Sequence, residues 1–395
     1  MKFYSADVVF PIETASIPNG LLVTEDDGTI IACLSPEHPD YSLQNAEILT
    51  GWLVPGFVNA HCHLELSHLK NKIPQHTGLD GFVQDLMRLN IASDREKQEA
   101  IQAADAEMLA NGIVAVGDIS NGSDSFELKG ASKIQYFTFI ERFGFNPVAA
   151  DIALESGKTL LEVLRQLPQN NQGNLAPHAN YSVSIPLLRK IVHQLEIEKG
   201  IFTIHNQESE SENEFFQFKT GKMVERFEKM NIPLSHFEAS GKSSLETMLP
   251  YFPSKIPLQL VHNTFSSELD IQKAIQQNSN TYFCLCPAAN IYIENKLPNL
   301  EWIRRNTNQI TIGTDSLASN SQLDILEELI ILQNAFPGIP ADELLKWGTL
   351  NGANYLGFSE SLGSFSKGKK PGIFNLLDVN SFSYKINSSA KKAIV

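Results

Sequence analysis

Cysteine is scarce in this chain, and no two cysteines have the spacing of a redox or metal-binding motif. The four cysteines among the 395 residues are Cys33, Cys62, Cys284 and Cys286. None belongs to a Cys-x-x-Cys unit, so neither a disulfide framework nor a cysteine-rich structural zinc site is indicated. We interpret Cys284 and Cys286, which alternate within an apolar run, as reduced core thiols.

Basic clusters and long apolar runs are absent as well. The formal net charge is −14, which makes nucleic acids and anionic membrane surfaces poor partners. No run of about 18 apolar residues occurs, so no transmembrane helix is predicted. The first residues, Met1 to Asp7, lack the apolar core of a secretory signal, and we expect a cytoplasmic protein.

After Pro55, strand-like runs alternate with long helical stretches. The eight strand candidates are Val54–Ala60, Ile113–Asp118, Gln135–Ile140, Asn174–His178, Phe202–His205, Leu258–His262, Tyr282–Cys286 and Gln309–Thr314. Examples of the amphipathic helices between them are Asp94–Asn111, Ile185–Lys199 and Gln322–Phe336. This α/β alternation predicts a (β/α)₈ TIM barrel. A doubly wound sheet is the alternative, but no Gly-x-Gly-x-x-Gly follows the first strand.

Short strand candidates at both ends of the chain predict a second, smaller domain. Near the N-terminus they are Phe3–Phe10, Gly20–Thr24 and Thr29–Leu34, with a hairpin signal at residues 25–28. Near the C-terminus they are Gly363–Phe365 and Ile373–Asp378. We expect residues 1–53 and 360–395 to form a small β-sandwich domain beside a barrel domain of residues 54–359.

Two histidines at the end of the first barrel strand are the most informative motif. The apolar run Val54–Ala60 leads into His61 and His63, which are spaced i, i+2. Alternate side chains of a strand leave the same face, so both imidazoles can reach one metal ion. Alone, the pair is equally consistent with one core and one surface histidine. The strand before it and the residues downstream favour a metal site.

Polar residues also end several of the later strand candidates, where a barrel places its catalytic side chains. These residues are His178, His205, His262 and Asp315. Five of the ten histidines therefore fall at strand ends, namely His61, His63, His178, His205 and His262.

With these residues in place, the chain resembles the amidohydrolase superfamily. The likeness is greatest to its cytosine deaminase-like branch, which also contains triazine chlorohydrolases, adenosylhomocysteine deaminases and aminofutalosine deaminases. The motifs that carry it are Pro55–His63, Pro177-His178-Ala179, His205-x-x-Glu208, His262, Cys286–Asn290 and Gly313–Asn320. In this order they cover the chain from about residue 50 to residue 355.

The resemblance implies one divalent metal ion per chain, with zinc as the expected ion and iron as the alternative. The implied ligands are His61, His63, His205 and Asp315. This set leaves an open position for water, as a catalytic site requires. Binuclear members of the superfamily carry a carboxylated lysine at the end of strand four. Strand four ends here at His178 and has no lysine at this position. We therefore expect a single metal ion, which argues against a hydantoinase-like or dihydroorotase-like enzyme.

The resemblance also implies the catalytic roles of three residues. Asp315 would take the proton of the water, His262 would stabilise the oxygen of the tetrahedral intermediate, and Glu208 would protonate a ring nitrogen of the substrate. The alternative for Glu208 is an acidic surface loop, because Glu210, Glu212 and Glu214 follow it.

Two further residues are candidates for substrate binding. The resemblance implies that His178 faces the substrate, and the alternative is a core histidine with satisfied hydrogen bonds. Glu65 departs from the Leu-Pro-Met that follows the His-x-His motif in many relatives. It would place a carboxylate near the mouth of the site, where it binds a hydroxyl or an amine or pairs with a local cation.

We therefore expect a hydrolase of carbon–nitrogen bonds other than peptide bonds. The favoured reaction is hydrolytic deamination of an aminated heterocycle or nucleoside of the aminofutalosine or adenosine type. Displacement of chloride and opening of a cyclic amide are alternatives, whereas a non-catalytic barrel is disfavoured because all four ligands are present. The expected partner is a small heterocyclic substrate, and a homodimer is expected from base rates alone.

Overall fold

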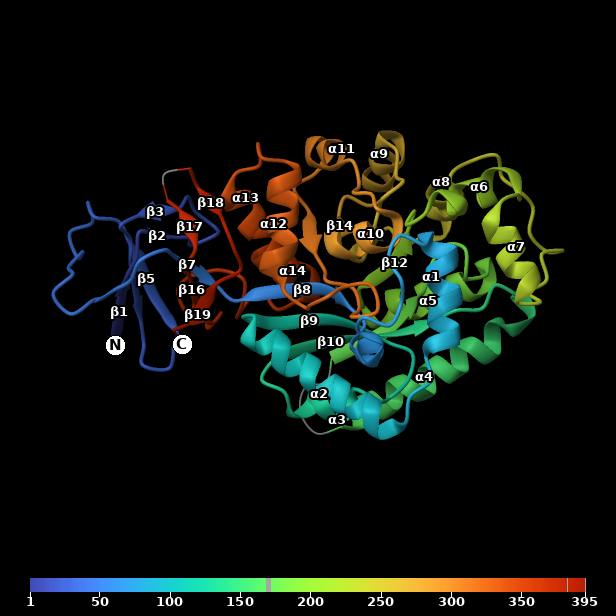
Figure 1. Ribbon diagram of the computed structural model, residues 1–395, viewed down its shortest axis with the longest axis horizontal. Helices are drawn as coiled ribbons and strands as arrows, with labels where there is room; N and C mark the ends of the chain where they lie inside the picture. The colour runs from blue at the N-terminus through green and yellow to red at the C-terminus, as the bar shows by residue number, and fades with distance from the viewer. Residues whose placement is uncertain (168–171, 382, 395) are drawn as a thin grey trace.

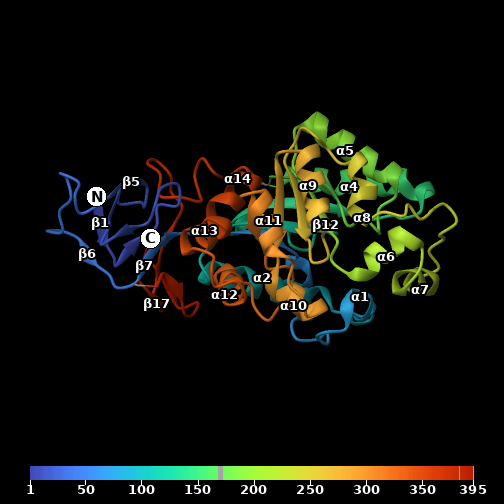
Figure 2. The same cartoon turned by 90° about the horizontal axis from the view of Figure 1, so that it is seen from above.

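The computed structural model describes residues 1–167, 172–381 and 383–394. The chain forms a barrel with a smaller unit of β-strands at one end, so the molecule is elongated (Figure 1). The first and last strands of the chain lie together in that smaller unit in both views (Figure 2).

The barrel contains two sheets of four parallel strands each. The first sheet has the order β11-β10-β9-β8, with bounds Gln172–Pro177, Gln135–Arg142, Ile113–Ser120 and Phe57–Cys62. The second has the order β12-β13-β14-β15, with bounds Phe202–Asn206, Leu258–His262, Thr281–Leu285 and Ile310–Ile312. These eight strands correspond to the eight candidates of the sequence.

The two sheets meet at two seams that backbone hydrogen bonds cross. At one seam, the amide of His205 donates to the carbonyl of His178 at 2.9 Å. At the other, the amides of Thr314 and Asp315 each donate to the carbonyl of His61 at 3.1 Å. The strands therefore follow one another around a ring, as the predicted (β/α)₈ barrel requires.

Helices connect the barrel strands, and no described helix has the length and apolar character needed to cross a membrane. The α-helices are α1 (Gly78–Leu89), α2 (Asp94–Ala110), α3 (Phe126–Ala131), α4 (Ala150–Gln166), α5 (Ile185–Glu198), α6 (Glu210–Phe218), α7 (Lys222–Lys229), α8 (Ser244–Met248), α9 (Glu268–Gln277), α10 (Pro287–Glu294), α11 (Leu300–Asn306), α12 (Ile325–Ala335), α13 (Ala341–Lys346) and α14 (Gly352–Leu356). The described residues also form three 3₁₀-helices, η1 (Leu64–Leu69), η2 (Pro147–Ala149) and η3 (Leu249–Tyr251), and one π-helix, η4 (Trp347–Asn351).

Side-chain caps set the helix boundaries that the sequence predicted only approximately. Before α2, the Ser93 hydroxyl accepts from the amide of Glu96, whose carboxylate accepts from the amide of Ser93. Before α12, the carboxylate of Asp324 accepts from the amide of Leu326 at 2.9 Å. The helix therefore begins at Ile325, three residues after the predicted start at Gln322.

The smaller unit contains strands from both ends of the chain. One sheet has the order β5-β4-β1-β6, with bounds Ile30–Leu34, Leu21–Thr24, Lys2–Ser5 and Glu47–Ile48. The other has the order β19-β16-β7-β2-β3, with bounds Lys391–Ala393, Ile373–Leu376, Trp52–Pro55, Val8–Val9 and Ile17–Pro18. A separate pair joins β17 (Val379–Asn380) to β18 (Lys385–Ile386). Residues 382 and 395 of the predicted domain lie outside the described residues.

One buried apolar cluster takes residues from both of these sheets. Tyr4 and Leu22 come from the first sheet, and Leu53 and Ile373 come from the second. Phe365, which joins the same cluster, is 3% exposed. The burial of these side chains holds the N-terminal and C-terminal segments together.

Two strand predictions in this unit are wrong. The predicted strand Phe3–Phe10 divides into β1 and β2, which belong to different sheets, because the chain crosses from one sheet to the other after Ser5. Residues 363–365 form no strand: Gly363 has a φ of 87°. Phe365 is apolar because it fills the core, which is the same sequence signal that a strand gives.

Candidate metal centre and active site

Four predicted ligands converge at the carboxyl ends of the barrel strands. Nε2 of His63 lies 3.2 Å from Nε2 of His61 and 3.2 Å from Nε2 of His205. Oδ1 of Asp315 lies 3.7 Å from Nε2 of His61 and 3.5 Å from Nε2 of His63. Tetrahedral ligands at zinc distances of about 2.0–2.1 Å lie about 3.3–3.4 Å from one another. The three imidazole nitrogens, which lie within 4.8 Å of one another, therefore fit one small divalent ion, and Asp315 lies within 3.7 Å of two of them.

The protonation of these groups also fits a cation. Nδ1 of His205 donates to the carbonyl of His178 at 2.7 Å, which leaves the lone pair of Nε2 toward the other ligands. Burial lowers the pKa of His205 and lowers that of His63 to about 3, so both imidazoles are neutral at pH 7. Burial alone would raise the pKa of Asp315, but the neighbouring imidazoles of His61 and His63 hold it well below its usual range. Neutral imidazoles and a carboxylate are the forms that bind a metal ion.

Hydrogen bonds between strands hold Asp315 in place. The side chain of Asn59, on β8, donates to Oγ1 of Thr314 at 2.7 Å, and Oδ1 of Asn59 accepts from the amide of Thr314 at 3.1 Å. Oδ2 of Asp315 accepts from the hydroxyl of Ser319 at 2.5 Å, so Oδ1 is left for the imidazoles. The φ of Asp315 is 56°, a left-handed conformation that costs about 1–3 kcal/mol and is often found at functional sites.

Glycine is required beside the first histidine. A Cβ atom at Gly313 would lie 2.7 Å from Cβ of His61 and 2.8 Å from its carbonyl oxygen. The end of β15 can approach β8 closely only because this residue has no side chain.

Glu208 and His262 lie side by side next to the four ligands. Oε1 of Glu208 lies 3.7 Å from Nε2 of His262. Nδ1 of His262 lies 2.8 Å from Oδ1 of Asn290, and its ring stacks on that of His205 at 5.5 Å between centroids. Burial raises the pKa of Glu208 to about 7, although His262 opposes the shift. A carboxyl group with a pKa near neutrality suits proton transfer at pH 7.

Glu208 does not lie on an exposed acidic loop, because the residue is only 7% exposed. The carboxylate of Glu212 accepts from the amides of Gln207 and Glu208 at 3.1 and 3.2 Å. Glu212 is itself buried and fixes the backbone that carries Glu208. Glu212, which the surface-loop alternative counted among the exposed acidic residues, is therefore a buried residue that positions Glu208.

His178 borders the cluster from the end of β11. Its ring lies 4.9 Å from that of His205 between centroids, and its Nδ1 lies 2.6 Å from the hydroxyl oxygen of Ser182. Burial and the nearby Arg226 guanidinium lower the pKa of His178 to about 4, so the ring is neutral.

Glu65 pairs with amide groups rather than with a cation. Its Oε2 accepts from the backbone amides of Asn121 at 2.9 Å and Gly122 at 3.3 Å, and its Oε1 accepts from the side chain of Asn121 at 3.0 Å. Burial raises its pKa to about 7. Both oxygens therefore already have protein partners.

Sequence reasoning missed Glu141, the penultimate residue of β10. This side chain is 3% exposed, and its Oε1 lies 3.6 Å from Nδ1 of His205. Burial raises its pKa to about 7. The signal was present, because Glu141 directly follows the predicted strand Gln135–Ile140, as His205 and Asp315 follow or end theirs.

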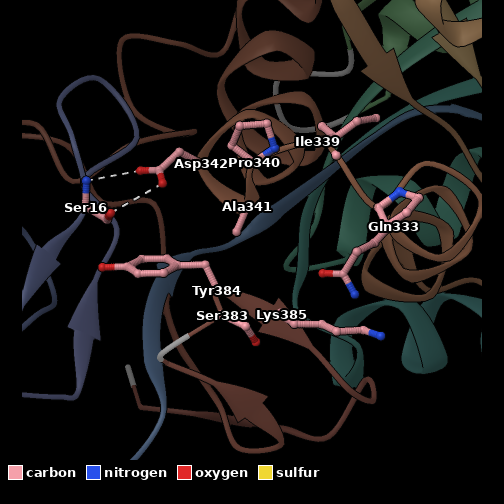
Figure 3. Close-up of a pocket in the computed structure, with 11 residues that line it drawn as sticks. Ser16, Gln333, Ile339, Pro340, Ala341, Asp342, Ser383, Tyr384 and Lys385 are labelled. Atoms are coloured by element: carbon pink, nitrogen blue, oxygen red, sulfur yellow. Dashed lines mark hydrogen bonds between the residues drawn. The ribbon is translucent and has the colours of Figure 1, made fainter.

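A separate pocket of about 500 Å³ is lined by none of these residues. It opens between the smaller unit and α12–α13, where both the amide and the hydroxyl of Ser16 donate to the carboxylate of Asp342 (Figure 3). Tyr384 and Lys385 line it from the C-terminal segment.

Several known proteins are similar to this chain. An adenosine deaminase of Helicobacter pylori is 27% identical over 281 residues, which cover 70% of this chain and 66% of that protein. An aminodeoxyfutalosine deaminase of Nitratiruptor is 25% identical over 343 residues, with coverage of 82% and 78%. A 5-methylthioadenosine/S-adenosylhomocysteine deaminase of Teredinibacter turnerae is 26% identical over 380 residues, with coverage of 91% and 79%.

Solved structures share the fold. The crystal structure of Helicobacter pylori aminofutalosine deaminase with methylthio-coformycin superposes with a TM-score of 0.78 at 22% identity, covering 94% of this chain and 91% of that one. Zinc-bound atrazine chlorohydrolase of Arthrobacter aurescens gives a TM-score of 0.76 at 15% identity, with coverage of 100% and 94%. These similarities confirm the barrel fold.

The family model extends over nearly the whole chain. The model of the amidohydrolase family matches residues 52–392, which include every barrel strand and all the predicted site residues. The expectation of a hydrolase from this superfamily is thereby confirmed. The chain belongs to the amidohydrolase family.

Proposed function

We propose that the protein is a metal-dependent aminohydrolase that replaces the amino group of an aminated heterocycle or nucleoside with oxygen and releases ammonia. The observation that carries this proposal is the position of the buried Glu208–His262 pair beside the four converging ligand atoms. A general acid, a polar imidazole and a metal site in contact are the groups that hydrolysis of a C–NH₂ bond in an aromatic ring requires. The three relatives described above are named as deaminases of adenosine, of 5-methylthioadenosine/S-adenosylhomocysteine and of aminodeoxyfutalosine, which supports this substrate class.

One zinc ion per chain would be held by His61, His63, His205 and Asp315, with iron as the alternative. A divalent ion there would lower the pKa of a water molecule, so that a nucleophile is available at pH 7. In our proposal, Oδ1 of Asp315 accepts the proton of that water. Each ligand comes from the end of a barrel strand, so the geometry is held by the rigid part of the fold.

Glu208 and His262 would act on the substrate. Glu208 donates its proton to a ring nitrogen, which makes the neighbouring carbon more electrophilic. As the carbonyl forms, the Glu208 carboxylate takes the proton of the added hydroxyl group and helps the amine to leave. Asp315 passes the proton that it took from water to the leaving amine, so ammonia departs and both carboxyl groups return to their starting state. His262 hydrogen-bonds the attacking oxygen and stabilises the charge that develops on it. His178 would contact the rest of the substrate. Glu65 would act on it through the loop of Asn121 and Gly122, because both of its oxygens already accept from that loop.

A metal hydrolase that displaces chloride is the second candidate. Its support is the likeness in fold to the zinc-bound atrazine chlorohydrolase, whereas the curated relatives above are deaminases. Opening of a cyclic amide is a third reaction of the same chemistry.

Product analysis separates these reactions. Purified protein would be incubated with adenosine, 5-methylthioadenosine, guanine, cytosine and a chlorotriazine, and ammonia and chloride would be measured. Release of ammonia from an adenine nucleoside supports the proposal. Release of chloride from the chlorotriazine without ammonia from the other substrates would replace it with the chlorohydrolase alternative.

The remaining expectations concern the molecule as a whole. We propose that residues 1–53 and 360–395 form one small β-sandwich domain and residues 54–359 the catalytic domain. We also propose that the enzyme is a cytoplasmic homodimer that acts on small molecules and binds neither nucleic acid nor membranes. Size-exclusion chromatography with light scattering would test the dimer directly.

A further inference from the structure

A cavity of about 500 Å³ lies between α1 and α7, which are neighbours in the fold (Figure 1, Figure 2). Val83 and Met87 line it from α1, and Lys222, Arg226 and Lys229 line it from α7. Residues three or four positions apart share one face of a helix, so each helix forms one wall of this α1–α7 pocket. None of the described residues that line it is a predicted metal ligand or catalytic residue, so the pocket is separate from the proposed active site.

Part of the lining of the α1–α7 pocket is apolar. Met87 is 59% exposed, and Met230, which follows α7, is 38% exposed. Val83 packs against the hydrophobic core and completes this part of the lining. Methionine side chains adapt to irregular shapes, and a ligand that covers them removes apolar surface from water. The volume of the pocket is in the range that binds small molecules.

The charged part of the lining is mainly basic, whereas the chain as a whole has a net charge of −14. Two ionisable residues of the lining are acidic, Asp80 and Glu225, and four are basic, Arg88, Lys222, Arg226 and Lys229. Arg88 pairs with Asp85 of its own helix at 2.8 Å. Lys222 and Lys229 form no ion pair with any described residue. The pocket therefore attracts an anion more than its surroundings do.

Arg226 is a buried cation with donors to spare. The residue is 9% exposed, and Asp80 is the one carboxylate among the described residues that it contacts, with 3.0 Å between Nη1 and Oδ1. Nη1 has no hydrogen-bond partner of suitable geometry among the described residues. The guanidinium lies over the ring of Tyr181, 5.1 Å from its centre. A guanidinium has five N–H donors, so Arg226 can hold a second carboxylate while it keeps its contact with Asp80.

We propose that the α1–α7 pocket binds a small organic acid with an apolar body. Its carboxylate lies near Arg226, Lys222 and Lys229, because a guanidinium and ammonium groups donate strong hydrogen bonds to a carboxylate. Its hydrocarbon part covers Val83 and the two methionines of the lining. This site goes beyond the proposed function and does not depend on it, since the pocket contains none of the residues proposed for deamination.

Calorimetric titration of the whole protein with three probes tests this site. Octanoate has both the charge and the apolar body, octanamide has only the apolar body, and inorganic phosphate has only the charge. Octanoate should bind about 10- to 100-fold more tightly than octanamide, since hydrogen bonds to charged groups are the stronger ones. Octanoate should also bind more tightly than phosphate. Equal affinities for octanoate and octanamide, or tighter binding of phosphate than of octanoate, would overturn the proposal.

A charge reversal in the lining locates the bound acid. Lys229 is exposed, so Lys229→Glu should fold as the wild type does, and it should bind octanoate at least about tenfold more weakly. Lys255→Glu is the control, because Lys255 is exposed before β13 and the change in net charge is the same. Wild-type affinity in Lys229→Glu, or an equal loss in both variants, would overturn the proposal. Because the titration needs no turnover, its result stands whether or not the protein deaminates nucleosides.

Discussion

Oε1 of Glu208 lies 3.7 Å from Nε2 of His262, and the two side chains are only 9% and 1% exposed. Water cannot screen a carboxyl group in this position, so its proton affinity is set by burial and by the imidazole next to it. The pair comes from the ends of two neighbouring parallel strands, β12 and β13. This arrangement leads to the first two predictions.

Removal of the acid should stop the reaction without unfolding the protein. Glu208→Gln keeps the shape of the side chain but cannot donate a carboxyl proton, so we expect kcat to fall by about 10²- to 10⁴-fold. Glu210→Gln is the control, because Glu210 is exposed two residues away, and its kcat should match the wild type. Near-normal turnover of Glu208→Gln would remove Glu208 from the mechanism.

The activity should fall as the pH rises above neutrality. Burial raises the pKa of Glu208 to about 7, and a general acid works only while it is protonated. Below pH 7 the acid is mostly protonated, and above pH 7 its protonated fraction falls tenfold per pH unit. A pH profile of kcat/KM should therefore show an alkaline limb near pH 7. Glu208→Gln should lack this limb in its residual activity, and a flat wild-type profile from pH 6 to 9 contradicts the assignment.

Metal content should depend on the first histidine of the His-x-His motif. Elemental analysis of the wild type should give about one zinc or iron per chain, and His61→Ala should lose it, because three ligands hold a catalytic ion much less tightly. His193→Ala is the control, since His193 is exposed on α5. Two metal ions per wild-type chain would contradict the single-ion proposal.

A side chain at Gly313 should disturb the metal site by displacing His61. Gly313→Ala would place a methyl group 2.7 Å from Cβ of His61, so we expect overpacking to cost about 1–3 kcal/mol and to lower metal content. Gly338→Ala is the control, because no atom lies within 4 Å of the Cβ it would add. Chemical denaturation and elemental analysis measure the two effects, and wild-type metal content in Gly313→Ala would show that the strand ends can separate.

A buried ion pair should stabilise the loop after the His-x-His motif. Nζ of Lys129 contacts Oδ2 of Asp118, both side chains are fully buried, and Oδ1 of Asp118 accepts from the amide of Leu64 at 2.8 Å. Lys129→Met leaves a buried carboxylate without its cation, and we expect the free energy of unfolding to fall by about 3–5 kcal/mol.

The exposed pair of Lys158 and Glu155 provides the comparison for this experiment. Lys158→Met should change the free energy of unfolding by less than about 1 kcal/mol, because exposed pairs contribute little. Urea denaturation of both variants decides the matter. Equal stability of Lys129→Met and Lys158→Met would mean that the buried pair is replaceable by apolar packing.

Much of the site follows from local sequence patterns. The side chains of His61 and His63 share a face because alternate residues of a strand do so in any protein. His205, His262 and Asp315 were placed correctly at the carboxyl ends of strands, because each ends a short apolar run. The roles of these residues stay predictions until the experiments above are done.

Other relationships depend on contacts between distant segments. Glu141 and Asn121 meet because β9 and β10 are neighbours, and the sequence does not reveal that one oxygen of Glu141 is left unpaired. Lys129 pairs with Asp118 across a strand and a helix. The segment Phe3–Phe10 is apolar throughout, and nothing in that pattern tells at which residue it passes from one sheet to the other.

Local sequence patterns account for the alternation of strands and helices, the two histidines on one strand face and the polar residues that end the strands. These features are fixed by backbone geometry and apolar periodicity, which act over a few residues. Contacts between distant segments determine which of the end residues touch, which hydrogen-bonding groups have no partner and how burial shifts each pKa. Those properties depend on closure of the barrel, since it brings the ends of β8 and β15 and of β11 and β12 together and removes the water between them.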